Sequence, residues 1–125
     1  MRKNIESSKA PAPIGPYSQA VQNDGILYVS GQIGINQATG NLVNASIEEE
    51  THQVMKNLGY VLEAANMKFK NILKCSIFVK NLGDFEKINA VYGEYFSSNY
   101  PVRETVEVSR LPKDVNIEIS CIATE

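Results

Sequence analysis

The amino-acid sequence predicts an α+β fold in which two helices cover one face of a mixed, mostly antiparallel sheet. Two segments, residues 47–66 and 85–96, place apolar residues at the spacing of amphipathic helices. Several other segments are short and rich in β-branched residues, which is typical of strands. Because each helix needs a surface for its apolar face, we expect both to pack on the same side of the sheet.

The first elements are an extended arm and a strand. Three prolines within residues 11–16 fix backbone φ angles and favour an ordered, non-helical arm that leads into Tyr17. The segment GILYVSGQIGI follows, and its glycines, Gly31 and Gly34, indicate a strand that bends or lets another group approach its backbone closely. The letters TGNL then predict a turn.

Capping signals support both helices. Ser46 followed by Glu49 is a capping-box pattern at the start of the helix expected over residues 47–66. A strand-like run, ILKCSIFVK, comes next, and Asp84 is placed to cap the second helix. The apolar face of that helix comprises Phe85, Ile88, Tyr92 and Phe96. Asn89 lies at its edge, so the amide either satisfies a nearby backbone group or points into a pocket.

The last two strands are predicted to form a hairpin. The segments VRETVEVSRL and VNIEISCIA are separated by Pro112, Lys113 and Asp114, which are typical turn residues. Alternation then assigns one apolar face, toward the helices, to Val106, Val108, Val115, Ile117, Ile119 and Cys121.

The opposite, bare face of this hairpin is expected to be mainly polar. It comprises Arg103, Thr105, Glu107, Ser109, Asn116, Glu118, Ser120 and Ile122. If Leu111 opposes Asp114 across the turn, then Glu107 faces Glu118, and the two carboxylates should repel each other.

Composition excludes several classes of protein. The 125 residues suffice for one domain, which we assign to residues 1–125. A net charge of −2 and the lack of a basic patch argue against nucleic-acid binding. No apolar run is long enough to span a membrane and no signal peptide is evident, so a cytoplasmic location is expected. With one histidine and no Cys-x-x-Cys pair we predict no metal site, and Cys75 and Cys121 are expected to be buried, reduced thiols.

Arg103 raises the question of function. On a bare sheet face, the arginine could simply be solvated, as polar residues on antiparallel sheets often are. Alternatively, the face is covered by another copy of the chain, because Ile33, Ile35 and Ile122 add apolar area to it. At such a seam the guanidinium could bind a carboxylate through two parallel hydrogen bonds, a geometry that lysine cannot reproduce.

Longer phrases carry a resemblance to a known family. In order along the chain they are APAPIGPYSQA, YVSGQIG, EETHQVMKNL, SIFVKNLGDFEKINAVYGEYF and PVRETVEVSRLPKDVNIEIS. Together they cover nearly the whole sequence and resemble the RidA (YjgF-type) subgroup of the Rid family of reactive-intermediate deaminases. The resemblance implies a chorismate-mutase-like fold and a homotrimer whose sheets face inward, with ligand sites in the clefts between subunits.

The resemblance also implies an activity, the hydrolysis of 2-imino acids, such as 2-aminoacrylate/2-iminopropanoate and 2-iminobutanoate, to 2-oxo acids and ammonia. No cofactor is implied, and the substrates are products of pyridoxal-phosphate-dependent serine and threonine dehydratases. Arg103 stands where the family has its carboxylate-binding arginine, and Glu118 where it has the acidic residue that positions or activates water. The implied substrate-binding residues are Arg103, Tyr17, Ser30, Gly31, Asn89 and Thr105.

A distance argument places the site between subunits. In the hairpin register Arg103 opposes Ile122, four residues from Glu118, or about 13 Å along a strand. A three-carbon substrate cannot span that distance, so we expect Arg103 of one subunit to work with Glu118 of its neighbour.

The chain departs from the family after the arginine, where Glu104 and Thr105 replace a small residue and a cysteine. Glu104 should point away from Arg103 unless a bulge turns it toward the cleft, where it would compete for the guanidinium. This change keeps a second function open, a regulatory protein that binds 2-oxo or amino acids without turnover. An RNA-directed role, as a translation inhibitor or ribonuclease, ranks third because of the acidic composition.

Overall fold

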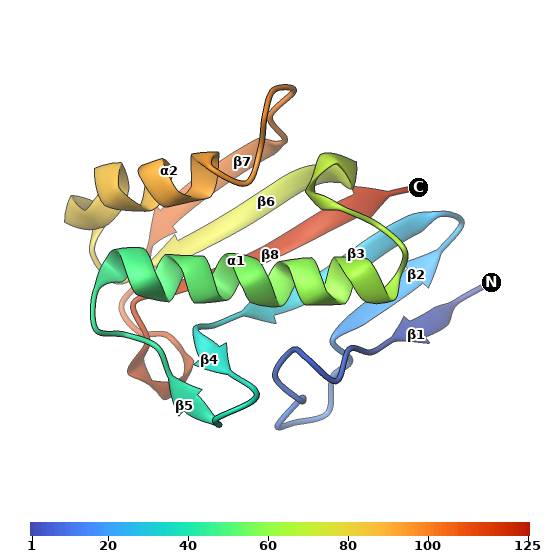
Figure 1. Cartoon of the computed structure of the whole chain (residues 1–125), viewed down its shortest axis with the longest axis horizontal. Helices are drawn as coiled ribbons and strands as arrows, with labels where there is room; N and C mark the ends of the chain where they lie inside the picture. The colour runs from blue at the N-terminus through green and yellow to red at the C-terminus, as the bar shows by residue number, and fades with distance from the viewer.

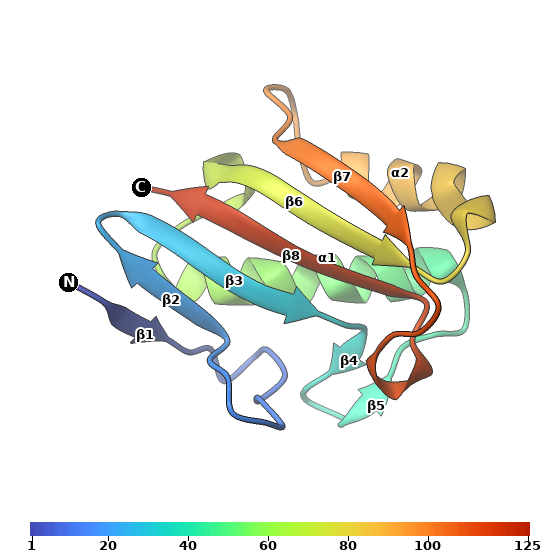
Figure 2. The same ribbon diagram turned by 180° about the vertical axis from the view of Figure 1, so that it is seen from behind.

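The computed structural model describes residues 1–125 and contains one six-stranded sheet, one two-stranded sheet and two α-helices. The strands are β1 (Lys3–Ile5), β2 (Ala20–Asn23), β3 (Ile26–Gln32), β4 (Ile35–Asn36), β5 (Asn41–Leu42), β6 (Ile72–Val79), β7 (Val102–Glu107) and β8 (Ile117–Thr124). The helices are α1 (Ile47–Ala64) and α2 (Phe85–Gly93). Both lie on the same face of the large sheet, as predicted, and the other face is bare (Figures 1 and 2).

The strand order of the large sheet, β1-β2-β3-β8-β6-β7, corrects the predicted hairpin. β7 and β8 are not neighbours, because β6 lies between them, antiparallel to β8 and parallel to β7. Parallel neighbours need a long crossover connection, which α2 provides between β6 and β7. The Pro112–Asp114 segment forms a 3-10 turn in the loop that carries the chain past β6. A short turn after a strand therefore did not imply a hairpin here.

Pairing with β6 also reverses the predicted faces of β7. Arg103 lies in register with Cys75 of β6, which lies in register with Cys121 of β8, and both cysteines are buried beneath the helices. Arg103 and Thr105 therefore point to the helix side of the sheet, whereas Val106 is exposed on the bare face. The predicted repulsion does not occur either, because Glu107 accepts a hydrogen bond from the Leu82 backbone at 2.9 Å.

The faces of β8 agree with the prediction. Ile117, Ile119 and Cys121 are buried against the helices. The residues between them alternate to the other side and are half-buried: Glu118, Ser120 and Ile122. The core is thus built mainly from β3, β6, β8 and the inner side of α1.

The helix limits are close to those expected. The Ser46 hydroxyl accepts a hydrogen bond from the Glu49 backbone at 3.1 Å, which confirms the N-terminal cap. α1 ends at Ala64, and Asn66 has a positive φ of 58°, which takes the chain out of the helix. Asp84 occupies the N-cap position of α2, but its side chain makes no capping bond. Asn81 instead caps the 3-10 turn just before, by accepting from the Gly83 backbone at 2.8 Å.

The inner side of α1 includes three buried polar residues that fasten loops to the helix. The Asn57 side chain donates to the backbone carbonyls of Ile33 and Ile35, both at 2.9 Å, and accepts from Gln53 at 2.9 Å. The Glu50 carboxylate accepts from the backbone and side-chain amides of Asn116, both at 2.8 Å. These bonds satisfy groups that would otherwise be buried without partners, and they hold the segments at the ends of β3 and β8.

The proline arm is ordered and non-helical, as predicted. The Gln19 side chain is 3% exposed and donates to the carbonyls of Ser7, Ala10 and Pro11 at 3.0–3.4 Å. It also accepts from the Ser7 backbone at 2.7 Å. One buried amide thus ties the arm to the start of β2.

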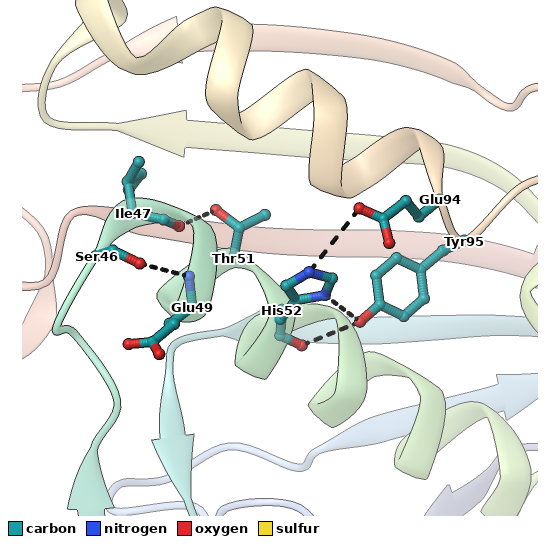
Figure 3. A network of polar contacts seen from close by, with 7 residues as sticks. All are labelled: Ser46, Ile47, Glu49, Thr51, His52, Glu94 and Tyr95. Carbon is teal, nitrogen blue, oxygen red and sulfur yellow. Dashed lines mark hydrogen bonds and ion pairs between the residues drawn. The ribbon is translucent and has the colours of Figure 1, made fainter.

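The single histidine has partners that the sequence did not indicate. The Nδ1 atom of His52 in α1 lies 2.9 Å from the hydroxyl of Tyr95, just after α2 (Figure 3). Its Nε2 lies 4.0 Å from a carboxylate oxygen of Glu94. The contact helps to fix the position of α2 against α1.

Both thiols are free and buried, as expected, and burial raises the pKa of Cys75 and of Cys121. Because the reactive species is the thiolate, we expect native protein at pH 8 to react with a disulfide reagent such as Ellman's at less than about a hundredth of the rate of unfolded protein. Two thiols per chain should titrate in guanidinium. Rapid reaction of either thiol in native protein would contradict this placement.

Candidate functional site

The sequence-predicted site residues fall into two groups on opposite faces of the sheet. Arg103, Asn89 and Thr105 lie between β7 and α2 on the helix side. Tyr17, Ser30, Gly31 and Glu118 line a cavity that opens on the bare side. We call these the arginine half-site and the glutamate half-site.

In the arginine half-site, the guanidinium is held by α2. Its Nη1 donates to the Asn89 side-chain oxygen at 2.7 Å. The guanidinium carbon also lies 5.5 Å from the centre of the Phe85 ring and 5.1 Å from that of Tyr92, so two aromatic faces stabilise its charge. Asn89 therefore points to the arginine rather than to a backbone group, and Arg103 remains half-buried at the edge of the sheet.

Two hydroxyls of the arginine half-site are buried without a hydrogen-bond partner, those of Tyr92 and Thr105. The sequence placed Tyr92 on the apolar face of α2, but helical spacing does not reveal whether its hydroxyl group is buried or reaches water. Burial raises the pKa of Tyr92, and the neighbouring Cys75 thiol raises it further. Unpaired buried polar groups cost about 1–3 kcal/mol each, so their presence beside Arg103 marks this region as one not optimised for stability alone.

The glutamate half-site is shaped by a bulge in β3. Val29 pairs with Cys121 and Gln32 with Ile119, so Ser30 and Gly31 together oppose Ser120. The Ser30 hydroxyl donates to the Ser18 carbonyl at 2.6 Å, which joins the bulge to the segment after Tyr17.

Gly31 is required by the Glu118 carboxylate. A Cβ atom at position 31 would lie 2.3 Å from Oε2 and 2.7 Å from Cδ of Glu118, closer than such atoms approach in real proteins. The expectation that this strand lets a group approach its backbone is therefore confirmed. The carboxylate has no ion-pair partner within the chain, and burial raises its pKa above the ordinary value.

A cavity of about 270 Å³ lies in front of Glu118 and Gly31. Its further lining includes Pro11, Ile14, Ile33, Ile35 and Pro112. Tyr17 stands at its border with 51% of its surface exposed, and its ring lies beside Gly15 of the proline arm. The sequence had indicated Ile33 and Ile35 as apolar area, but their position beside Glu118 depends on the bend after β3.

Glu104 does not approach Arg103. Its carboxylate accepts from the Ser76 hydroxyl and lies 3.4 Å from Lys74 Nζ, on the bare face. The Ser76 hydrogen bond and Lys74 lower the pKa of Glu104. The expected orientation by alternation is confirmed, and no bulge turns this residue toward the arginine.

The two half-sites cannot meet within one chain. Arg103 aligns with Cys121, which is three residues from Glu118, so the two side chains leave opposite faces of the sheet. This corrects the register in which Arg103 opposes Ile122 on the same face. Within one chain, Arg103 does not line the cavity that contains Glu118. No cluster of three or more His, Cys, Asp or Glu side chains is suited to a metal, and neither helix could cross a membrane.

Comparison with known proteins gives a consistent family. Residues 7–125 match the family described as Endoribonuclease L-PSP. The human 2-iminobutanoate/2-iminopropanoate deaminase is 42% identical over 125 residues, which cover 100% of this chain and 91% of the human protein. A RutC family protein of Pyrococcus horikoshii is 46% identical over 123 residues, 98% of each chain.

Solved structures share the fold. YyfA of Yersinia pestis, described as a protein of the conserved Rid family, has a TM-score of 0.97 and 46% identity, with 100% of both chains covered. TdcF of E. coli, solved with bound serine, has a TM-score of 0.94 and 37% identity, with 98% of both chains covered.

The close contact at Gly31 generates a testable prediction. In Gly31→Ala the new methyl group must displace the Glu118 carboxylate toward water, so the raised pKa of Glu118 should fall toward its ordinary value. Titration of the carboxyl carbon by NMR measures this directly. Gly93→Ala is the matched control, since a Cβ there meets nothing within 4 Å. An unchanged Glu118 pKa in Gly31→Ala would contradict the geometry.

Proposed function

Since the chain belongs to the RidA/YjgF/L-PSP family, we propose that it hydrolyses small 2-imino acids to 2-oxo acids and ammonia. The proposed substrates are 2-aminoacrylate/2-iminopropanoate and 2-iminobutanoate, which pyridoxal-phosphate-dependent dehydratases release. The observation that carries the proposal is the division of Arg103 and Glu118 between opposite faces of the sheet. Each half-site is incomplete alone, and two chains together supply an anion-binding group and a base.

A homotrimer with the bare faces inward is part of the proposal. One row across that face, through β7, β6, β8 and β3, contains Val102, Lys74, Ile122 and Tyr28. Val102 is 67% exposed and Tyr28 51% exposed in the single chain. A second copy that covers this row removes apolar surface from water, worth about 25 cal/mol for each Å². Because the arginine half-site lies at the edge strand β7, the proposal requires this edge of one copy to meet the bare face of the next.

Arg103 is suited to bind the substrate carboxylate. Asn89 and the two aromatic rings fix the plane of the guanidinium before the substrate arrives, so less conformational entropy is lost on binding. The remaining N–H groups can donate two parallel hydrogen bonds to a carboxylate. Thr105 and Tyr17 then lie beside the bound substrate as further contacts.

Glu118 is suited to act as the general base. Its half-buried position raises its pKa, which brings the carboxylate closer to the basicity that proton transfer near neutral pH requires. A water molecule attacks C2 of the iminium as Glu118 takes its proton, and the C=N electron pair moves to nitrogen. Protonated Glu118 then returns this proton to nitrogen, and as ammonia leaves, the hydroxyl oxygen forms the C=O bond and gives its own proton to the Glu118 carboxylate. The iminium carbon is already electrophilic, so the residues need only hold the carboxylate and orient water.

A regulatory protein that binds amino or 2-oxo acids without turnover is the second candidate, favoured by the serine bound to TdcF. The two functions differ in ammonia release. When a threonine dehydratase generates the imine in situ, the enzyme should accelerate the appearance of 2-oxobutanoate, whereas a binding protein should leave the rate unchanged. An RNA-directed function has only the family description behind it, and the net charge of −2 opposes it.

The division of the site between chains can be tested by complementation. Arg103→Ala and Glu118→Ala should each lower the imine-hydrolysis rate by about 10²–10⁴-fold. After the two inactive proteins are unfolded together and refolded, about a quarter of the clefts in a cyclic trimer should contain both native residues. Activity should return to that extent, measured by 2-oxo acid formation. Each variant refolded alone is the control, and no recovery in a mixed trimer would contradict a shared cleft.

The pH dependence tests the role of Glu118. Because only the carboxylate can accept a proton, kcat/KM should fall as pH decreases through the pKa of this residue. Burial places that limb above the ordinary value of 4.5. Glu118→Gln should remove the limb together with most of the activity, whereas Glu48→Gln, an exposed carboxylate at the start of α1, should keep both. A limb that persists in Glu118→Gln would assign it to another group.

A further inference from the structure

A groove on the helix side of the molecule shares no residue with either half-site. It lies between the second half of α1, the 3-10 turn Phe69–Asn71 and the chain just after α2. The two helices that border it pack side by side on this side of the sheet (Figure 1). Its volume of about 660 Å³ is more than twice that of the cavity in front of Glu118 and is typical of sites for small molecules.

Aromatic rings held by the fold form the base of this groove. The Phe69 ring packs on α1 at Gly59, where a Cβ atom would lie only 3.1 Å from two of the ring carbons. The ring centre of Phe69 is 5.1 Å from that of Tyr95, whose hydroxyl lies 2.9 Å from His52 Nδ1. Rings fixed in this way offer flat surfaces on which a flat ligand can stack, or which it can meet edge to face.

The rim of the groove has an excess of positive charge. Lys56 and Lys68 line it, both are exposed, and neither has an ion-pair partner within the chain. The one carboxylate of the lining, that of Glu63, lies 3.3 Å from Lys9 Nζ. A negatively charged ligand therefore meets two free ammonium groups, while the acidic side chain that would repel it is already paired.

The lysines stand next to the rings. Lys56 precedes Gly59 by about one turn on the same side of α1, and Lys68 directly precedes Phe69. A compact ligand can therefore cover the Phe69 ring and still bring an acid group within reach of a lysine. An alkyl chain of similar size buries apolar surface as well, but it lacks the ring contacts, each of which contributes about 2–10-fold in affinity.

We propose that the groove between α1 and the Phe69–Asn71 turn is a binding site for planar aromatic carboxylates. This inference goes beyond the proposed function, because imine hydrolysis requires none of the residues that line the groove. From the usual binding free energy per atom of small ligands, a carboxylate with two fused rings should bind with a dissociation constant of about 0.1–1 mM.

Titration of the full chain with 2-naphthoate, followed by proton–nitrogen NMR spectra, tests the site. Saturable shifts should centre on the backbone amides of Gly59, Lys68 and Tyr95. Naphthalene-2-carboxamide keeps the rings without the charge and should bind about 2–10-fold more weakly. Octanoate keeps the charge without the rings and should bind about 5-fold more weakly or less. No saturation at about tenfold the expected dissociation constant, or equal affinity for either control compound, would overturn the inference.

Substitutions of exposed lysines assign the charge selectivity to the groove. The double variant Lys56→Gln, Lys68→Gln should weaken 2-naphthoate binding by about 2–10-fold and leave naphthalene-2-carboxamide binding unchanged. Lys87→Gln is the matched control, since Lys87 is exposed on α2 and does not line the groove. An unchanged affinity of the double variant for 2-naphthoate would contradict the proposed role of the two lysines.

Two further variants separate the groove from the arginine half-site and test the rings. The Arg103 guanidinium also attracts carboxylates, so Arg103→Ala should keep the 2-naphthoate shifts at Gly59 and the affinity that they report. Phe69→Leu should lower the preference for 2-naphthoate over octanoate by about 2–10-fold. Loss of 2-naphthoate binding in Arg103→Ala, shifts confined to residues around Arg103 and Glu118, or an unchanged preference in Phe69→Leu would overturn the inference.

Discussion

Parallel pairing of β7 with β6 determines where the arginine points, and the character of the site depends on it. An edge strand one residue out of this register would direct Arg103 to the bare face and bury Glu104 under α2. In the observed register the guanidinium lies under α2, where Asn89 and two aromatic rings hold it. Glu104 is directed to Lys74 and Ser76 on the other side, so two neighbouring residues of opposite charge are kept apart by the sheet itself.

The same sheet separates the arginine from the glutamate. A β-sheet is an effective barrier between side chains of opposite faces, so a reaction that needs both groups requires contact between chains. This links assembly to chemistry in the proposed function: a single chain contains every residue of the site but no complete cleft. The exposed aliphatic and aromatic side chains of the bare face provide the apolar area for such an assembly.

Several groups of the site are placed at a cost to the single chain. Two hydroxyls are buried without partners beside Arg103, and the Glu118 carboxyl is half-buried against the backbone of Gly31. Burial favours the neutral form of Glu118, so the ionised form required of a base is the one that this fold stabilises less. Hydrogen bonds of three buried polar side chains nearby hold the surrounding backbone in place: Gln19, Glu50 and Asn57. Functional groups are commonly held this way, in strained or desolvated positions on a rigid frame.

The local features of the chain were determined by the sequence itself. Helix spacing and the Ser46 cap located α1, alternation identified the buried side of β8, and the glycine in β3 predicted the close approach that Gly31 makes to Glu118. The candidate residues Arg103 and Glu118 followed from motifs that span nearly the whole chain. The helix, its cap and the alternation depend on neighbours within a few residues, which is the range over which periodicity carries physical information.

Only the tertiary structure decided which strands pair and which face each presents. Alternation divides β7 into two faces without stating which is buried, and the insertion of β8 between β3 and β6 depends on contacts distant in sequence. Periodicity likewise did not predict the burial of the Tyr92 hydroxyl or the hydrogen bonds from Asn57 to Ile33 and Ile35. Both depend on how side chains from separate elements meet in the folded chain. Long-range register is set by the packing of the whole core, so no short segment contains it.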